Sequence, residues 1–127
     1  MRSSGKTRVA VNGYGVIGKR VARAVTRHDL LEASDIIIDC TPKNIAVNNI
    51  EIYRQRGIKF IVQGGEKHDT TGHSFVAEAN YDSAVGRDST RVVSCNTTSI
   101  VRTLTALKRA GLLRKARGTL LRRATDP

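Results

Sequence analysis

A glycine-rich turn near the amino terminus constrains the fold of this chain more than any other feature. It separates an apolar run at residues 8–12 from residues 16–28, whose apolar positions recur at helical spacing. Residues 12–18 fit the pattern Gly-x-Gly-x-x-Gly. Between a strand and a helix, Gly13 allows a tight turn, Gly15 lets a pyrophosphate approach the backbone, and Gly18 lets the helix pack closely on the strand. Because free N–H groups at the helix start bind phosphate, the turn predicts dinucleotide binding.

Strands and helices alternate along the rest of the chain. The expected strands are residues 36–38, 58–62, 90–94 and 116–122. The expected helices are residues 44–56 and 98–110, ended by Gly57 and Gly111, and a loop over 66–89 has one short helix near 81–85. This alternation predicts an α/β, Rossmann-like, doubly wound parallel sheet. We expect one domain over residues 8–127, preceded by a basic tail at residues 1–7.

Several classes of protein are excluded by the sequence. No apolar run reaches the roughly 18 residues that span a bilayer, and residues 1–8 are polar and basic, unlike a secretory signal. Cys40 and Cys95 lie too far apart in sequence for a disulfide framework or a metal cluster, so no metal is expected. These features favour a reducing, cytoplasmic location.

The net charge of +11 is unevenly distributed. Residues 1–28 hold seven Lys or Arg and no acidic residue, and residues 89–125 hold nine and none, whereas the middle of the chain is mildly acidic. Such ends attract anions: nucleotides, phosphorylated sugars or nucleic acid. Solvated faces and cations at helix ends explain them equally well. Bases stack on aromatic rings, but the Tyr and Phe residues form no cluster with the basic runs, so any nucleic-acid binding is expected to be nonspecific.

Asp39 has two interpretations. It ends the expected strand at 36–38, 21 positions after Gly18. A Rossmann site usually has an acid about 20 residues after the turn that holds the ribose hydroxyls, which would favour NAD. Alternatively, Asp39 is a strand-end carboxylate that caps local backbone N–H groups.

Cys95 lies in the turn Ser94-Cys95-Asn96, where a strand meets a helix. The helix dipole there favours a thiolate and so a nucleophile. A cysteine at such a turn can equally be a small buried hydrophobe, and the spacing alone leaves both readings open.

Several blocks together resemble the archaeal-type phosphorylating glyceraldehyde-3-phosphate dehydrogenases. They are residues 9–21 (Val-Ala-Val-Asn-Gly-Tyr-Gly-Val-Ile-Gly-Lys-Arg-Val), 63–67 (Gln-Gly-Gly-Glu-Lys), Asn80-Tyr81, 91–98 (Arg-Val-Val-Ser-Cys-Asn-Thr-Thr) and Arg122-Arg123. The resemblance implies NAD- or NADP-dependent oxidation of glyceraldehyde 3-phosphate, with inorganic phosphate, to 1,3-bisphosphoglycerate in glycolysis or gluconeogenesis. It implies that Cys95 is the nucleophile and that Ser94 and Asn96 line the substrate site. The cofactor contacts that it implies are Gly13, Gly15, Val16, Ile17, Gly65 and Arg123.

Two departures from the family suggest a shortened relative. Only residues 29–34 stand where the family has a strand, the residues that choose NAD or NADP, and a helix, so we expect a reduced number of strands. The family also continues beyond Arg123 into a catalytic domain that supplies the histidine base. The chain's own histidines, His28, His68 and His73, all precede Cys95 and do not match that base. We therefore expect the chain alone to be inactive; the alternatives are a non-catalytic nucleotide-binding module and a basic polyanion-binding fragment.

Overall fold

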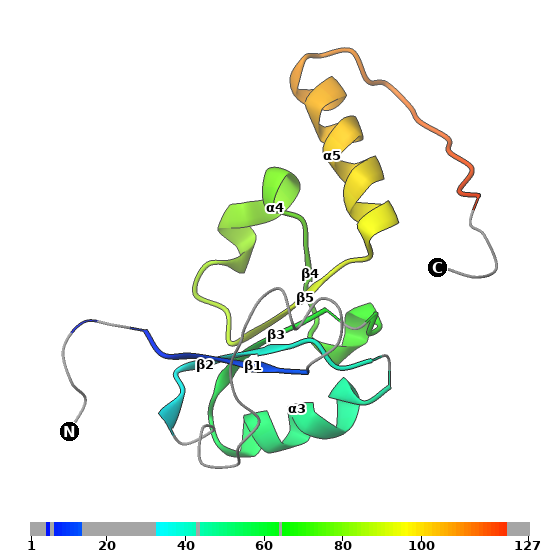
Figure 1. Ribbon diagram of the computed structural model, residues 1–127. Coiled ribbons are helices and arrows are strands. Elements are labelled where there is room, and N and C mark those ends of the chain that lie inside the picture. The colour runs from blue at the N-terminus through cyan, green and yellow to red at the C-terminus, as the bar shows by residue number, and fades with distance from the viewer. Residues whose placement is uncertain (1–4, 6, 14–32, 43, 64, 122–127) are drawn as a thin grey trace.

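The computed structural model describes residue 5 and residues 7–13, 33–42, 44–63 and 65–121 (Figure 1). The strands are β1 (Val9–Asn12), β2 (Ile36–Asp39), β3 (Lys59–Val62), β4 (Ser74–Phe75) and β5 (Ser89–Val92). The helices are α3 (Ala46–Gln55), α4 (Ala77–Ala84), α5 (Cys95–Arg109) and a 3-10 helix, η1 (His68–Thr70). The expected helix at residues 16–28, with Gly15, Val16, Ile17 and Gly18, lies outside the described residues, as does Arg123.

The five strands form one sheet in the order β1-β2-β3-β5-β4, and every neighbouring pair is parallel. This confirms the α/β Rossmann-like class. In the usual Rossmann order β1 is an inner strand. Here β1 has a neighbour on one side only among the described strands, which agrees with the reduced strand number.

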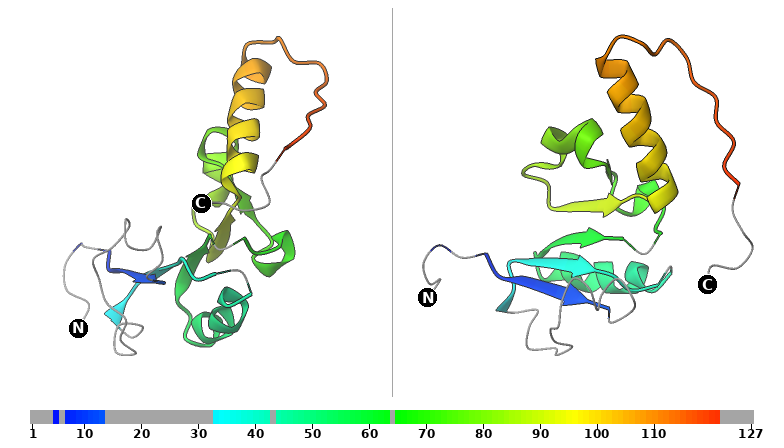
Figure 2. Two further views of the ribbon diagram at one scale, coloured as in Figure 1. Left: turned by 45° about the vertical axis from the view of Figure 1, so that its right-hand side comes forward. Right: turned by 45° about the horizontal axis from the view of Figure 1, so that its top comes forward.

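The main core lies between the sheet and α3. In Figure 1, α3 lies below the sheet, whereas α4 and α5 stand above it and α5 points away from it. The two further views in Figure 2 show the same separation. The buried core side chains come from β2, β3 and α3, and they are Ile37, Ala46, Ile50, Tyr53, Phe60 and Val62. Tyr53 and Phe60 pack with ring centroids 5.6 Å apart.

The helix α5 begins at Cys95, three residues before the expected start. Ser94 is its N-cap, because the Ser94 Oγ accepts a hydrogen bond from the Thr97 N–H at 3.2 Å. The Thr98 N–H donates to the Ser94 carbonyl at 2.8 Å, which closes the first turn. This capping places Cys95 within the first turn rather than in the loop before it.

The expected strand at residues 116–122 is wrong over its described part, because residues 116–121 form no strand and are exposed. Both edges of β5 already pair, with β3 and β4, so no position next to β5 is free. The short β4 and most of α4 lie in a segment expected to be a loop, since two residues are too few to show a strand periodicity. None of the described helices is both long and apolar enough to cross a membrane.

Candidate functional site

The carboxyl ends of the parallel strands bring four segments to one edge of the sheet. Asn12 pairs with Asp39, Asp39 with Val62, and Val62 with Arg91, so the strands end in register. Gly13 follows β1, Cys40 follows β2, Gln63 follows β3, and Ser94 precedes α5 just beyond β5. In open α/β sheets, ligands bind at this edge. The sheet therefore gathers the predicted cofactor and catalytic segments at one place.

Gly13 is a position that only glycine fits. Its φ is +108°, and a Cβ there would lie 2.7 Å from the Cys40 carbonyl carbon and 2.8 Å from the Thr41 nitrogen. Both neighbours are backbone atoms, so a side chain would displace the loop after β2. The first glycine of the motif thus lets two strand ends approach each other as well as turning the chain.

Asp39 is fully buried, and its carboxylate already has five donors. Its Oδ1 accepts from the Thr41 N–H at 2.9 Å and the Thr41 hydroxyl at 2.5 Å. Its Oδ2 accepts from the Tyr53 hydroxyl at 2.8 Å, Asn49 Nδ2 at 3.0 Å and Asn12 Nδ2 at 3.4 Å. This leaves no acceptor for ribose hydroxyls. The interpretation of Asp39 as a ribose-binding acid is therefore wrong. Asp39 instead caps a local backbone group, the Thr41 N–H.

Tyr53 stays protonated, and its hydroxyl donates a hydrogen bond to Asp39. Burial raises the pKa of its hydroxyl well above the ordinary range; a bond from Asn12 opposes that shift, and the Asp39 charge adds to it. The donor set around Asp39 therefore stays intact across ordinary pH. It ties the ends of β1 and β2 to α3, which supports the edge that carries Gly13.

Cys40 lies at the same edge but is poorly suited as a nucleophile. It is half-buried, and Gln63 Nε2 donates to its Sγ at 2.6 Å. Burial raises the pKa of the Cys40 thiol; the Gln63 bond opposes this shift, and the Asp39 charge adds to it. Cys40 therefore stays a thiol at neutral pH and links β2 to β3 through Gln63.

Cys95 is exposed at the first turn of α5, which contradicts its reading as a buried hydrophobe. Its neighbours have different surroundings: the Ser94 hydroxyl caps the helix and lies 2.9 Å from the Thr97 Oγ1, and Asn96 is half-buried. Gly65, after β3, has a φ of +93° with open space around it. Cys95, Ser94, Asn96 and Gly65 thus all lie on segments that leave the same edge of the sheet.

Neither described histidine hydrogen-bonds to Cys95. His73 is buried, with Nδ1 2.6 Å from the Thr90 Oγ1 and Nε2 2.9 Å from the Ser83 Oγ. Burial lowers the pKa of His73, and the charges of Arg87 and His68 lower it further. The His68 Nδ1 lies 2.9 Å from the Ser74 Oγ. The partners of both rings thus lie on β4, β5 and α4. His28 lies outside the described residues.

Glu66 is a buried residue that the sequence reading did not single out. It is 5% exposed, and both of its carboxylate oxygens lack a hydrogen-bond partner in the described chain. Its backbone carbonyl accepts from the Arg91 Nη1 at 2.7 Å. No signal marks Glu66 in the sequence beyond its place in the block at residues 63–67. In the described part of the chain, no group of His, Cys, Asp or Glu is arranged to hold a metal ion.

Comparison with known proteins finds archaeal glyceraldehyde-3-phosphate dehydrogenases that are similar to this chain. A glyceraldehyde-3-phosphate dehydrogenase of Methanococcoides burtonii is 39% identical over 171 residues, covering 96% of this chain and 51% of that protein. The enzyme of Methanothermobacter thermautotrophicus is 39% identical over 169 residues, covering 94% of the chain and 50% of that protein. The chain is therefore similar in sequence to archaeal glyceraldehyde-3-phosphate dehydrogenases over nearly all of its own length. No family model matches the chain.

The archaeal dehydrogenases also show how this chain differs from them. The chain spans about half the length of the curated relatives it matches. The alignment with the Methanococcoides burtonii enzyme runs over 171 residues, more than the 127 of the whole chain, so the dehydrogenases have an internal segment that this chain lacks. A gap relative to the family is therefore confirmed. Both the resemblance and the shortening predicted from the motifs agree with these matches.

Proposed function

We propose that the chain is the nucleotide-binding part of a phosphorylating glyceraldehyde-3-phosphate dehydrogenase, with the nucleophile Cys95 on the same edge as the cofactor turn. The observation that carries this proposal is the shared edge: Gly13 after β1 and Cys95 after β5 both lie at the carboxyl ends of the sheet. Homology over nearly the whole chain supports it. NAD and NADP both remain candidate cofactors. We further propose that residues 8–127 are one domain after a basic tail at residues 1–7, in the cytoplasm.

The residues present suit a dinucleotide. The backbone at Gly13 leaves no room for a side chain, and Gly65 adds a second turn with open space at the same edge. We propose that the backbone of Gly13 and Gly15 holds the pyrophosphate, and that Gly65 also contacts the cofactor. Val16, Ile17 and Arg123, outside the described residues, complete the proposed cofactor set by homology.

The proposed role of Cys95 is to attack an aldehyde carbon, which its exposure at the start of α5 supports. The exposed Sγ at the start of α5 forms the bond, and the aldehyde oxygen takes up a proton to give a thiohemiacetal. When bound, a nicotinamide cofactor would supply the hydride acceptor for oxidation to the thioester. Inorganic phosphate would then attack the thioester carbon and break its C–S bond, giving the acyl phosphate and the free Cys95 thiol. Ser94 and Asn96 flank the nucleophile and are the proposed substrate contacts.

We also propose that the 127-residue polypeptide by itself does not catalyse repeated turnover. Oxidation needs a base near the reacting hydroxyl, and a positioned base contributes roughly 10²–10⁴-fold. Both ring nitrogens of His73 contact hydroxyl groups, and His68 contacts Ser74. A coupled assay with glyceraldehyde 3-phosphate, phosphate and each cofactor should show no repeated turnover. Multiple turnovers that disappear in Cys95→Ser would contradict this part of the proposal.

Cofactor binding is tested separately by calorimetry with NAD and NADP. Wild-type protein should bind at least one of them, and Gly15→Val should remove binding because the side chain fills the space that the pyrophosphate needs. Gly118→Val is the matched control, since a Cβ at Gly118 meets nothing within 4 Å. Equal binding by the wild-type protein and Gly15→Val would refute the site. Binding without any reaction at Cys95 would favour the non-catalytic nucleotide-binding module.

Competitive alkylation at neutral pH tests the choice of nucleophile. Cys95 should label faster than Cys40, because Cys95 is exposed at a helix start whereas burial raises the pKa of Cys40. Peptide mass spectrometry reads both sites in one sample. Unfolded protein is the control, in which the two rates should converge. Faster labelling of Cys40 in the folded chain would reject Cys95 as the nucleophile.

A further inference from the structure

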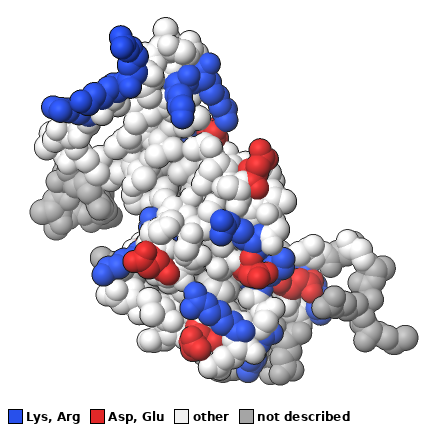
Figure 3. Space-filling view, turned by 180° about the vertical axis from the view of Figure 1, so that it is seen from behind, with Lys and Arg blue, Asp and Glu red and all other residues white. Residues whose placement is uncertain are grey.

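A basic surface covers the carboxyl end of α5 and the chain that follows it. No acidic residue occurs between residues 89 and 121. Figure 3 shows Lys and Arg side chains gathered at this end of the molecule. The exposed cations, together called the α5 basic surface, are Lys108, Arg109, Arg114, Lys115 and Arg117.

The acidic residues of the neighbouring helix do not neutralise this surface. Glu78 of α4 pairs with Arg102, with 2.6 Å between the Glu78 Oε1 and the Arg102 Nε. The Arg109 Nη2 donates to the backbone carbonyl of Glu78 at 2.5 Å and so keeps its full charge. Asp82 is exposed on α4 and is the other acidic residue of that helix. Because Arg102 pairs with Glu78, Asp82 is the one acidic side chain of α4 that remains to oppose the five cations.

Helix-end electrostatics explain only part of the α5 basic surface. Lys108 and Arg109 lie in the last turn of α5, where cations interact favourably with the helix dipole. Arg114, Lys115 and Arg117 lie beyond the helix, in a segment with no regular structure. Their charges stabilise no described element, which leaves them available for an anionic partner.

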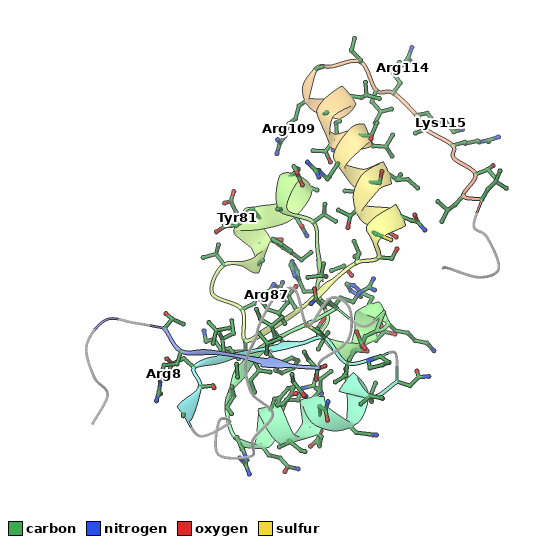
Figure 4. All side chains as sticks on the ribbon, viewed as in Figure 1. Arg8, Tyr81, Arg87, Arg109, Arg114 and Lys115 are labelled. Atoms are coloured by element: carbon green, nitrogen blue, oxygen red, sulfur yellow. The ribbon has the colours of Figure 1, made fainter. Side chains whose placement is uncertain are left out.

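An exposed aromatic ring lies on the same side of α5 as Arg109, whereas Arg114 and Lys115 follow beyond the end of the helix (Figure 4). Tyr81 of α4 is 61% exposed, and its ring packs against that of Phe75 with centroids 6.3 Å apart. In Figure 4, Tyr81 and Arg109 project on the same side of the α4–α5 pair. Arg87, held by a 2.7 Å bond from its Nε to the Ser83 carbonyl, follows at the end of α4. The linear sequence separates Tyr81 from Arg109, and the packing of α4 on α5 brings these two residues to one side of the helix pair.

We propose that the α5 basic surface binds single-stranded nucleic acid, with phosphates on the cations and a base stacked on Tyr81. Cations that follow the backbone, together with an exposed ring, are the combination by which proteins bind single strands without sequence preference. Exposed leucines such as Leu112 and Leu121 are also compatible with an anionic membrane. The exposed Tyr81 ring near Arg109 favours nucleic acid, because a lipid headgroup has no base that could stack on it. This site uses Tyr81, the carboxyl end of α5 and residues 114–117, none of which is among the proposed cofactor contacts.

The test is fluorescence anisotropy with labelled oligo-dT and oligo-U of about 15 nucleotides, within the range of known single-strand sites. Binding should weaken steeply with salt, with a log–log slope near −0.7 for each phosphate contacted. The double variant Arg114→Ala/Lys115→Ala should bind more weakly and reduce that slope by about 1.4. Arg56→Ala/Lys67→Ala, which removes two exposed cations elsewhere, should change binding less. An equal loss in both variants would overturn the proposal, since it would reflect net charge alone.

Tyr81 distinguishes stacking from plain electrostatics. Tyr81→Ala should lose at least about fivefold in affinity, and Tyr81→Phe should retain wild-type affinity because every base stacks on a phenyl ring. Equal affinity in Tyr81→Ala and wild type would remove the stacking role and overturn the proposal. Circular dichroism checks that each variant is folded.

Vesicles of phosphatidylcholine with phosphatidylserine test the competing partner. Binding to vesicles that exceeds binding to oligonucleotides, and that Leu112→Ser/Leu121→Ser abolishes, would overturn the proposal in favour of a membrane. Saturating NAD or NADP should leave oligonucleotide binding unchanged. Displacement by cofactor would also overturn the proposal, because it would place the strand at the cofactor edge.

Discussion

The two halves of the molecule are built differently. In the half formed by β1, β2, β3 and α3, the helix buries Ala46, Ile50 and Tyr53 against the sheet. In the half formed by α4 and α5, neither helix has a single buried residue. The first half therefore carries most of the hydrophobic stabilisation, whereas the second presents the thiol and the α5 basic surface to solvent.

The exposed helix α5 is stabilised locally instead. Ser94 caps its start, and cations occupy its last turn. At its end, Gly111 adopts a φ of +72° and the Leu112 N–H donates to the Leu107 carbonyl at 3.0 Å, as in a Schellman-type ending. Strong local signals thus form a helix that tertiary packing hardly supports. Helices that look equally regular in sequence can contribute very different amounts to stability.

The largest expected effect is the contrast between two isoleucines. Ile50→Ala should lower the free energy of unfolding by about 2–5 kcal/mol, because Ile50 is 2% exposed and its loss leaves a cavity. Ile100→Ala on α5 should cost less than about 1 kcal/mol, because Ile100 is already 42% exposed. Urea denaturation measures both. Equal losses would show that α5 packs as tightly as α3 in solution and would remove the comparison.

The next effect concerns the turn after β1. Gly13→Ala should cost about 1–3 kcal/mol for the unfavourable φ, and more because the Cβ meets the backbone of Cys40 and Thr41. Gly118→Ala, in open space within the segment after α5, should be nearly neutral. Thermal unfolding followed by circular dichroism compares the two. A neutral Gly13→Ala would mean that the ends of β1 and β2 do not approach as closely as described.

A smaller effect should depend on pH and arise where α4 of the second half meets β5 of the sheet. His73 bonds to Thr90 of β5 and Ser83 of α4, and its pKa is lowered by burial and by the Arg87 and His68 charges. Because the folded protein binds this proton less tightly than the unfolded chain, stability from His73 is present above its ordinary pKa and lost as pH falls through the lowered value.

Urea denaturation between pH 7.5 and about 5, around the ordinary histidine pKa, measures this term. The wild type should lose stability on acidification more steeply than His73→Gln. Arg87→Gln should fall between them, because it removes one of the charges that lower the pKa of His73. Identical slopes for the wild type and His73→Gln would contradict the buried position of the ring.

The smallest effect is expected at the surface of the second half. Arg102 and Glu78 form an ion pair whose side chains are 61% and 40% exposed. Exposed pairs contribute about 0.2–1 kcal/mol, so Glu78→Gln should reduce stability by no more than that, and high salt should remove the difference. A double-mutant cycle with Arg102→Met isolates the pair. A coupling above this range would show that the α4–α5 contact is more buried than described.

The sequence by itself determined the elements with strong local signals. The approximate spans of β1, β2, β3 and β5 follow from apolar runs, and the ends of α3 and α5 follow from Gly57 and Gly111, whereas α5 starts three residues before its expected start. Because local hydrogen bonding and backbone conformation depend on nearby residues, these features can be predicted without knowing the tertiary structure. The resemblance predicted from the blocks at residues 63–67 and 91–98 agrees with the archaeal dehydrogenases that comparison found.

Only the tertiary structure decided the surroundings of Asp39, residues 116–121 and Tyr81. The spacing of Asp39 fits a ribose-binding acid, but pairing of β2 between β1 and β3 turns it toward Tyr53 and Asn49, which saturate it. A strand is expected over residues 116–122, but β5 has no free edge for its described part. Tyr81 joins Arg109 only because α4 packs on α5. In each case the outcome depends on which elements are neighbours in space, and spacing along the chain does not contain that information.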